Sequence, residues 1–164
     1  MKISLRSFTI ADIDSVKQWA QNIEAGQYQS RIFPLAFNGK DLSGVDVLCA
    51  WYVILVDGED AGTVWLEKDT PEDESAILGI MLGRKELFGK GIGRQAIQQG
   101  IELAQPRLAF NSVVLTVRRD NERAIASYQH VGFSISREGI KVTEDGTRIP
   151  YFFMKFDLQK DIIS

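Results

Sequence analysis

Cysteine is nearly absent from this chain of 164 residues, and Cys49 is the only one. A single cysteine excludes an internal disulfide, which is typical of proteins from a reducing compartment. The first residues, from Met1 to Arg6, also lack the apolar core of a secretory signal. We therefore expect a cytoplasmic protein.

An excess of basic residues and long apolar runs are missing too. Lys and Arg number 19 against 22 Asp and Glu, so the formal net charge is −3. A general nucleic-acid-binding surface would need a basic excess. The longest unbroken apolar run, Val47 to Val56, is about half of the ~20 residues that a membrane-spanning helix needs. We expect neither nucleic acid nor a membrane among the partners.

The composition is that of an ordinary globular protein. Hydrophobic residues make up 45% of the chain and charged residues 25%. A chain of this length buries enough surface to form one hydrophobic core. A separate second domain is not expected. The sequence predicts a single domain over residues 1–164.

Hydrophobic periodicity predicts a mixed α/β order of elements. Apolar residues at helical spacing predict a helix over 12–23, after a short strand over 2–8. Two more helices are expected over 91–104, where Pro106 limits continuation, and over 121–130, where Gly132 ends the helix. The other predicted elements are a loop with one short helix over 24–46 and strands over 47–56, 62–67, 75–82, 113–117, 133–142 and 149–158.

The segment with the clearest chemistry is Phe88-Gly89-Lys90-Gly91-Ile92-Gly93, between a predicted strand and a predicted helix. Glycines allow a sharp turn in which several backbone N–H groups point at one spot, next to the positive end of the helix dipole. Four basic residues lie between positions 84 and 94, with Glu86 as the only acidic one. This pattern predicts a polyphosphate site, and the alternative is a solvated turn.

Two better-known phosphate motifs do not fit this segment. A Walker loop needs a Ser or Thr hydroxyl after its Gly-Lys pair, where this chain has Gly91. A dinucleotide fingerprint needs Gly-x-Gly-x-x-Gly after a βαβ opening, whereas Gly89, Gly91 and Gly93 are spaced Gly-x-Gly-x-Gly. The ATPase and Rossmann interpretations are therefore disfavoured.

The chain resembles the GNAT superfamily of N-acetyltransferases through two motifs about 30 residues apart. The glycine segment is similar to the acetyl-CoA motif Q/R-x-x-G-x-G/A, with Phe88 where many members carry Gln or Arg. The second motif is Asn121-Glu122-Arg123-Ala124-Ile125-Ala126-Ser127-Tyr128, followed by Gly132-Phe133. The likeness is greatest to the branch of ribosomal-protein and small-molecule N-acetyltransferases. It implies a single-domain mixed α/β fold with a mostly antiparallel, twisted sheet of about seven strands, flanked by helices and splayed around the acetyl-CoA site.

The resemblance also implies which residues bind acetyl-CoA. In the family the Asn contacts the cofactor arm, which assigns that role to Asn121, and the Tyr hydroxyl donates a proton to the leaving thiolate, which assigns Tyr128 as a catalytic residue. A phenol with an ordinary pKa near 10 is protonated at neutral pH, so this role is chemically reasonable. The full set of predicted cofactor-binding residues is Leu82, Gly83, Phe88, Gly89, Lys90, Gly91, Ile92, Gly93, Arg94, Asn121 and Tyr128. No metal is expected.

The general base is harder to assign from the resemblance. Some relatives carry a Glu where this chain has Thr116, and others a Glu where it has Ser75, with Glu74 adjacent. A one-residue slip turns a side chain to the other face of a strand unless a bulge intervenes. Glu74 is the candidate base, against the alternatives of an exposed carboxylate and a water chain. Cys49 and His130 are expected in packing or on the surface.

Three functions follow from these motifs. The first is transfer of acetyl from acetyl-CoA to a primary amine, on a protein N-terminus or a small molecule, by direct attack in a ternary complex. The second is a GNAT-fold module that binds coenzyme A without turnover, as a sensor or partner subunit. The third is a phosphate-binding regulatory domain unrelated to coenzyme A. A monomer and a homodimer both remain open.

Overall fold

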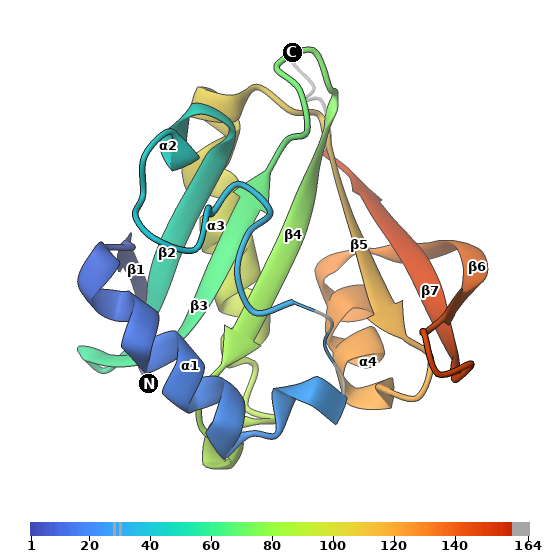
Figure 1. Ribbon diagram of the computed structural model, residues 1–164. Coiled ribbons are helices and arrows are strands. Elements are labelled where there is room, and N and C mark those ends of the chain that lie inside the picture. Colours follow the sequence, from blue (N-terminus) through green and yellow to red (C-terminus); the bar gives the residue numbers. More distant parts are fainter. Residues whose placement is uncertain (28, 30, 159–164) are drawn as a thin grey trace.

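The computed structural model describes residues 1–27, 29 and 31–158, and it contains a seven-stranded sheet with helices on both faces (Figure 1). This architecture confirms the predicted mixed α/β class. The strands are β1 (Ile3–Ser7), β2 (Cys49–Val56), β3 (Glu59–Glu67), β4 (Ser75–Leu82), β5 (Ser112–Arg118), β6 (Ser134–Val142) and β7 (Arg148–Asp157). The helices are α1 (Ile13–Asn22), α2 (Val45–Leu48), α3 (Ile92–Leu108) and α4 (Glu122–Val131), with 3-10 turns η1 (Ile10–Asp12), η2 (Ala25–Gln27) and η3 (Lys85–Leu87).

The sheet is antiparallel except at its centre. Its strand order is β1-β2-β3-β4-β5-β7-β6, and only β4 and β5 run parallel. That parallel pairing joins Ser75–Ile77 to Ser112–Val114 and then stops, although both strands continue. Figure 1 shows β4 and β5 diverging from there toward their C-terminal ends. The sheet is therefore splayed, as the family resemblance implies.

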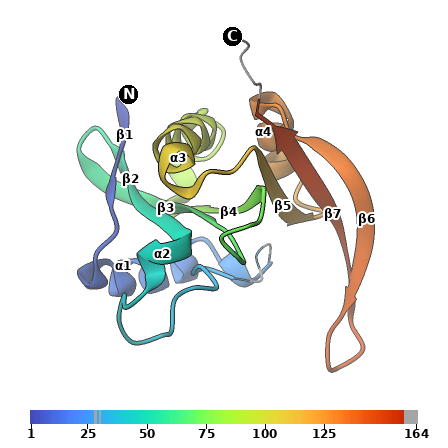
Figure 2. The ribbon, with the colours of Figure 1, turned by 90° about the horizontal axis from the view of Figure 1, so that it is seen from above.

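Helices cover both faces of the sheet. α3 and α4 lie on one face, and α1 and α2 lie on the other (Figure 2). Under α3, Ile97 packs into the larger apolar core with Ile54 and Leu66. Under α1, Val16 and Trp19 belong to a second core that contains three aromatic residues from the strands and the turn after β1. These cores hold β4 and the elements around it in fixed positions on both faces. Within the residues described, no helix combines the length and the apolar character that a membrane span requires.

Two of the differences between predicted and observed elements have a clear physical cause. The apolar run from Val47 was predicted to be a strand throughout, but Val45–Leu48 form the helical turn α2, with Val47 69% exposed. Apolar character alone could not separate this exposed turn from the buried strand that follows. The second helix was predicted to stop before Pro106, whereas α3 continues to Leu108. Pro106 lies in the last turn, where it removes a single hydrogen bond, and burial of Leu108 favours the extra turn.

Candidate functional site

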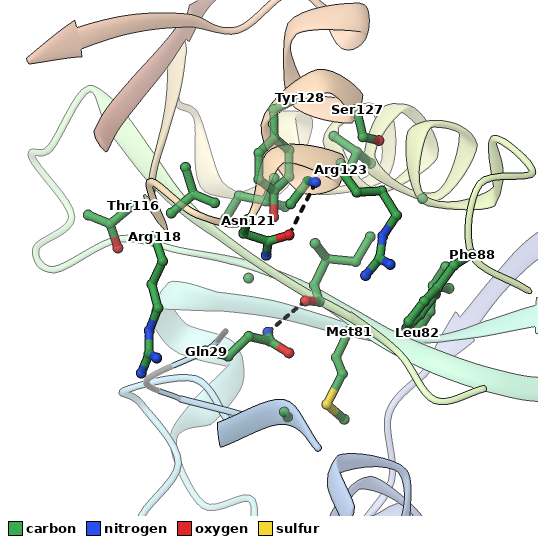
Figure 3. A pocket seen from close by; sticks show the side chains of 18 of the residues that line it. Gln29, Met81, Leu82, Phe88, Thr116, Arg118, Asn121, Arg123, Ser127 and Tyr128 are labelled. Carbon is green, nitrogen blue, oxygen red and sulfur yellow. Dashed lines mark hydrogen bonds between the residues drawn. The ribbon is translucent and has the colours of Figure 1, made fainter. Parts of the chain in front are cut away.

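The divergence of β4 and β5 opens a cavity of about 1040 Å³. Its walls come from β4, β5, the glycine-rich loop, α4 and the segment that follows α1. Figure 3 shows Phe88 and Arg123 toward one end of this cavity and Thr116 and Arg118 toward the other, with Asn121 and Tyr128 between them. Gln29 from the loop after α1 and residues of the β6–β7 hairpin also line it.

The backbone of β4 presents hydrogen-bonding groups to this cavity. The N–H of Gly83, just after β4, donates to the Ala61 carbonyl on the β3 side, at 2.7 Å. Successive backbone groups of a strand point to opposite sides, so those of Ile80 and Leu82 face the gap toward β5. The Ile80 carbonyl accepts a hydrogen bond there from Gln29 Nε2, at 3.0 Å. The N–H groups of Ile80 and Leu82 are therefore placed to bind an oxygen inside the cavity.

The glycine-rich loop forms a turn before α3. Gly89 and Gly91 have φ values of +77° and +78°, a region that favours glycine. Gly91 is the N-cap of α3, and the first turn of that helix holds no acidic residue. A Cβ atom at Gly91 would lie 2.8 Å from Arg94 Nη2. The loop, the helix N-terminus and a guanidinium thus converge on one spot, which is an arrangement suited to an anion.

The cavity brings together all the predicted cofactor-binding residues except Gly83 and Lys90. Those that line it are Leu82, Phe88, Gly89, Gly91, Ile92, Gly93, Arg94, Asn121 and Tyr128. Gly83 instead permits close packing, because a Cβ atom there would overlap the side chain of Trp19. Lys90 is exposed on the loop and is not part of the cavity wall.

Phe88 is the position at which the first motif departs from the family pattern, and it contacts the second motif. The Arg123 guanidinium carbon lies 3.9 Å from the centroid of the Phe88 ring. Such a cation–π contact contributes about 0.5–1 kcal/mol at an exposed site. It ties the glycine-rich loop to α4 across the cavity.

Asn121 and Tyr128 lie at the two ends of α4. Asn121 Oδ1 accepts a hydrogen bond from the Ala124 N–H at 3.3 Å, so this side chain caps the helix. Tyr128, about two turns later, packs against Phe133 with ring centroids 5.9 Å apart. Figure 3 shows its hydroxyl directed into the cavity. Burial raises the pKa of Tyr128 to about 12, so its hydroxyl keeps its proton at neutral pH.

Glu74, the candidate base, does not reach this cavity. It is exposed directly before β4, at the end opposite to Leu82, and it is not among the lining residues. Its backbone carbonyl accepts from Asn111 N at 2.8 Å, which holds β4 where it still pairs with β5. The neighbouring Ser75 Oγ shares a 2.6 Å hydrogen bond with Ser112 Oγ. The location of Glu74 outside the cavity therefore argues against this residue as the general base.

Two other side chains were expected to take no part in chemistry. Cys49 is 1% exposed, and burial raises the pKa of its thiol well above the ordinary range, so it packs and is not poised as a nucleophile. His130 is exposed on α4 and lies on the rim of the cavity. Among the described residues, no group of three or more His, Cys, Asp or Glu is arranged to hold a metal ion.

The charge of the cavity wall is opposite to that of the chain. Glu24 is the one carboxylate among the described lining residues, and it lies 4.0 Å from Lys85 Nζ. The cationic lining residues are Arg31, Lys85, Arg94, Arg118, Arg123 and Lys141. A strongly positive cavity in a chain of net charge −3 indicates an anionic ligand.

The predicted site residues did not include Arg118, Gln29 or Trp65, all of which line the cavity. Alternation along β5 could have indicated Arg118, because Val117 packs in the core under α3 and its neighbours must face the other side. Gln29 and Trp65 carried no comparable signal. They reach the cavity only because the segment after α1 and the strand β3 pack beside β4.

The family model described as acetyltransferase (GNAT) family matches residues 13–133. Spermidine N(1)-acetyltransferase of Escherichia coli K12 is 31% identical over 87 residues, which are 53% of this chain and 46% of that protein. The chain spans less than half the length of the curated relatives it matches.

Solved structures share the fold. Spermidine N-acetyltransferase from Vibrio cholerae, in complex with CoA and spermine, aligns with a TM-score of 0.77 and 19% identity, covering 94% of this chain and 95% of that one. Ribosomal-protein-S5-alanine acetyltransferase from Vibrio fischeri aligns with a TM-score of 0.76 and 16% identity, covering 96% and 93%.

Proposed function

The chain belongs to the acetyltransferase (GNAT) family, and we propose that it transfers an acetyl group from acetyl-CoA to a primary amine. The observation that carries this proposal is the cavity between β4 and β5, which has a glycine-rich loop suited to an anion at one end and the protonated Tyr128 hydroxyl inside it. We take residues 1–164 as one acetyltransferase domain.

The glycine-rich loop is the proposed site for the pyrophosphate of coenzyme A. Backbone N–H groups from Gly89 to Gly93 would donate to its oxygens, and Arg94 at the start of α3 would supply positive charge. Lys90 could contribute from the solvent side without lining the cavity. The pantetheine arm would then run between β4 and α4, past Asn121 toward Tyr128. The spacing of the two motifs along the cavity supports this direction.

The proposed reaction is a direct attack of the neutral amine on the thioester carbonyl. A C–N bond forms while the C–S bond breaks, and the electron pair of that bond leaves on sulfur. Backbone N–H groups of Ile80 and Leu82 would bind the developing oxyanion. Tyr128 would donate its proton to the thiolate and would recover one that the amine releases. Because Cys49 is buried in the core under α1, the proposed mechanism has no intermediate in which this cysteine is acetylated.

Deprotonation of the acceptor is proposed to need no carboxylate base. Glu24 is the one acidic residue among the described lining residues, and it faces Lys85. A positive cavity lowers the pKa of a bound amine because it disfavours the ammonium form. The proton would then pass to water. Conversely, a cavity without a clear base is also what a non-catalytic coenzyme A sensor would have, and this is the second candidate function.

Release of free thiol from acetyl-CoA separates the two candidates. The enzyme should release coenzyme A in an amine-dependent reaction, and Tyr128→Phe should slow it while acetyl-CoA binding is retained. A sensor should bind acetyl-CoA with no amine-dependent release. Absence of both binding and release would refute both functions.

A further inference from the structure

Two buried side-chain nitrogen atoms of cavity-lining residues lack hydrogen-bond partners. Among the residues that the structure describes, Trp65 Nε1 and Arg118 Nε are the only buried side-chain nitrogen or oxygen atoms without one. Both residues line the cavity between β4 and β5. Buried donors are normally paired, so an orphaned donor facing a cavity indicates a ligand that supplies an acceptor. Both atoms are N–H donors, and both therefore call for an oxygen.

The two donors lie on the same face of the sheet. Trp65 belongs to the core under α1, and its indole crosses β4 at Gly79, where a Cβ atom would overlap ring atom Cε2. Because Nε1 is bonded to Cε2, it lies close to β4 at Gly79, and Trp65 is one of the residues that line the cavity. Val117 belongs to the core under α3, so the neighbouring Arg118 faces the α1 side as well. This is the face opposite to α3 and α4.

Arg118 is held in place by one hydrogen bond and keeps its charge unpaired. Its Nη1 donates to the Gln27 carbonyl at 2.7 Å, which fixes the guanidinium against the segment after α1. Among the described residues it forms no ion pair, and neither does the cavity-lining Lys141 of β6, a strand that β7 joins to β5. Arg31 differs, because Glu67 lies 3.4 Å from its Nη1.

The cations at this end are separate from those of the glycine-rich loop. Figure 3 shows Arg118 at the opposite end of the cavity from Phe88, with Tyr128 between them. Pyrophosphate bound at the loop would engage Arg94 and leave Arg118 free. A polycationic acceptor would meet Arg118 and Lys141 without a compensating carboxylate, which is unfavourable.

We propose that the acceptor is a primary amine that carries a carboxylate, held by Arg118 with support from Lys141, while the Trp65 N–H donates to an oxygen of the same molecule. This inference rests on the proposed acetyl transfer. A carboxylate matches the planar donor fork of a guanidinium. The carboxylate could belong to a free amino acid or to a short peptide with a free N-terminus.

The test compares matched acceptors that differ only in this charge. Thiol release is measured for amino acids and their amides, for dipeptides and their amides, and for spermidine. A nearby carboxylate stabilises the ammonium form, so intrinsic reactivity favours the amides. We expect the opposite order, with higher kcat/KM for the acids and the lowest value for spermidine. If amino acids differ more from their amides than dipeptides do, the acceptor is a free amino acid. If dipeptides show the larger acid-to-amide difference, it is a peptide.

Variants then assign the preference to named side chains. Arg118→Gln should lower kcat/KM for the acid about 10- to 100-fold, mainly through KM, and should leave the matched amide unchanged. Trp65→Phe keeps a ring and removes the N–H, so KM should rise about 2- to 10-fold. Arg119→Gln is the control, because Arg119 is exposed, pairs with Glu138 and lies outside this cavity.

Three results would overturn the inference alone: equal rates for acids and amides, a preference for spermidine, or an equal loss for acid and amide in Arg118→Gln. No thiol release with any acceptor, despite binding of acetyl-CoA, would instead refute the proposed function and this inference with it.

Discussion

The Arg123 guanidinium stacks over the Phe88 ring at 3.9 Å, and this contact joins the two sequence motifs across the cavity. Phe88 comes from the glycine-rich loop and Arg123 from the first turn of α4, so the two elements that would hold coenzyme A support each other. The family motif has a polar residue at position 88 in many members. Here an aromatic ring meets the arginine of the second motif instead.

Loss of this contact should weaken cofactor binding. Phe88→Ala removes the ring, and a contact of about 0.5–1 kcal/mol corresponds to a rise of about 2- to 5-fold in the Kd of acetyl-CoA. Phe88→Tyr keeps the aromatic face and should bind as the wild type does. Calorimetric titration of both variants measures the effect, and equal Kd values for Ala and Tyr would show that the contact has no role.

Removal of the Tyr128 hydroxyl should slow chemistry without loosening the cofactor. A positioned general acid contributes about 10²–10⁴-fold, so kcat of Tyr128→Phe should fall within that range. The aromatic packing against Phe133 remains, so stability and the Kd of acetyl-CoA should not change. Steady-state kinetics at saturating acceptor give kcat, and an unchanged kcat would remove Tyr128 from the mechanism.

The pH dependence of turnover should have no alkaline limb from Tyr128 in the accessible range. Burial raises the pKa of this phenol from 10 to about 12, so the proton that it donates is lost only above roughly pH 11. Turnover should rise with pH as the acceptor amine deprotonates, and should then stay level. A pH profile of kcat tests this, and a fall that begins near pH 9 would mean an ordinary phenol or another acid.

Gly91 should tolerate no side chain if the loop holds a diphosphate. Its φ of +78° costs an L-residue about 1–2 kcal/mol, and a Cβ atom would displace Arg94. Gly91→Ala should therefore raise the Kd of acetyl-CoA, and Gly91→Glu should abolish binding by placing a negative charge in the loop. Gly26→Ala is the control, because a Cβ atom there meets nothing within 4 Å. The increase in melting temperature that acetyl-CoA causes in each of the three variants ranks their affinities for acetyl-CoA.

The sequence predicted what depends on local pattern. The loop from Phe88 to Gly93 is one short continuous motif, and Asn121 and Tyr128 belong to another. The structure brings most of these residues to one cavity. The order of apolar segments predicted the mixed α/β class from local periodicity, and the resemblance carried by the two motifs implied the splayed sheet.

The rest depends on tertiary packing that no single segment encodes. Glu74 seemed close to the site in sequence, yet it precedes β4 while the cavity opens at the other end of that strand. Trp65 reaches the cavity only because Gly79 lacks a side chain on the neighbouring strand. Arg118 is fixed by a carbonyl 91 positions away in the chain. Contacts of this kind follow from the fold and not from spacing.

Hydrogen–deuterium exchange with and without acetyl-CoA tests the central claim most directly, since it reports where the cofactor binds. We predict slower exchange of backbone amides in two segments, 80–94 and 121–128, with little change in β1 and β2. Unchanged exchange at saturating acetyl-CoA, or protection confined to other parts of the chain, would contradict the assignment of the cavity between β4 and β5 as the acetyl-CoA site.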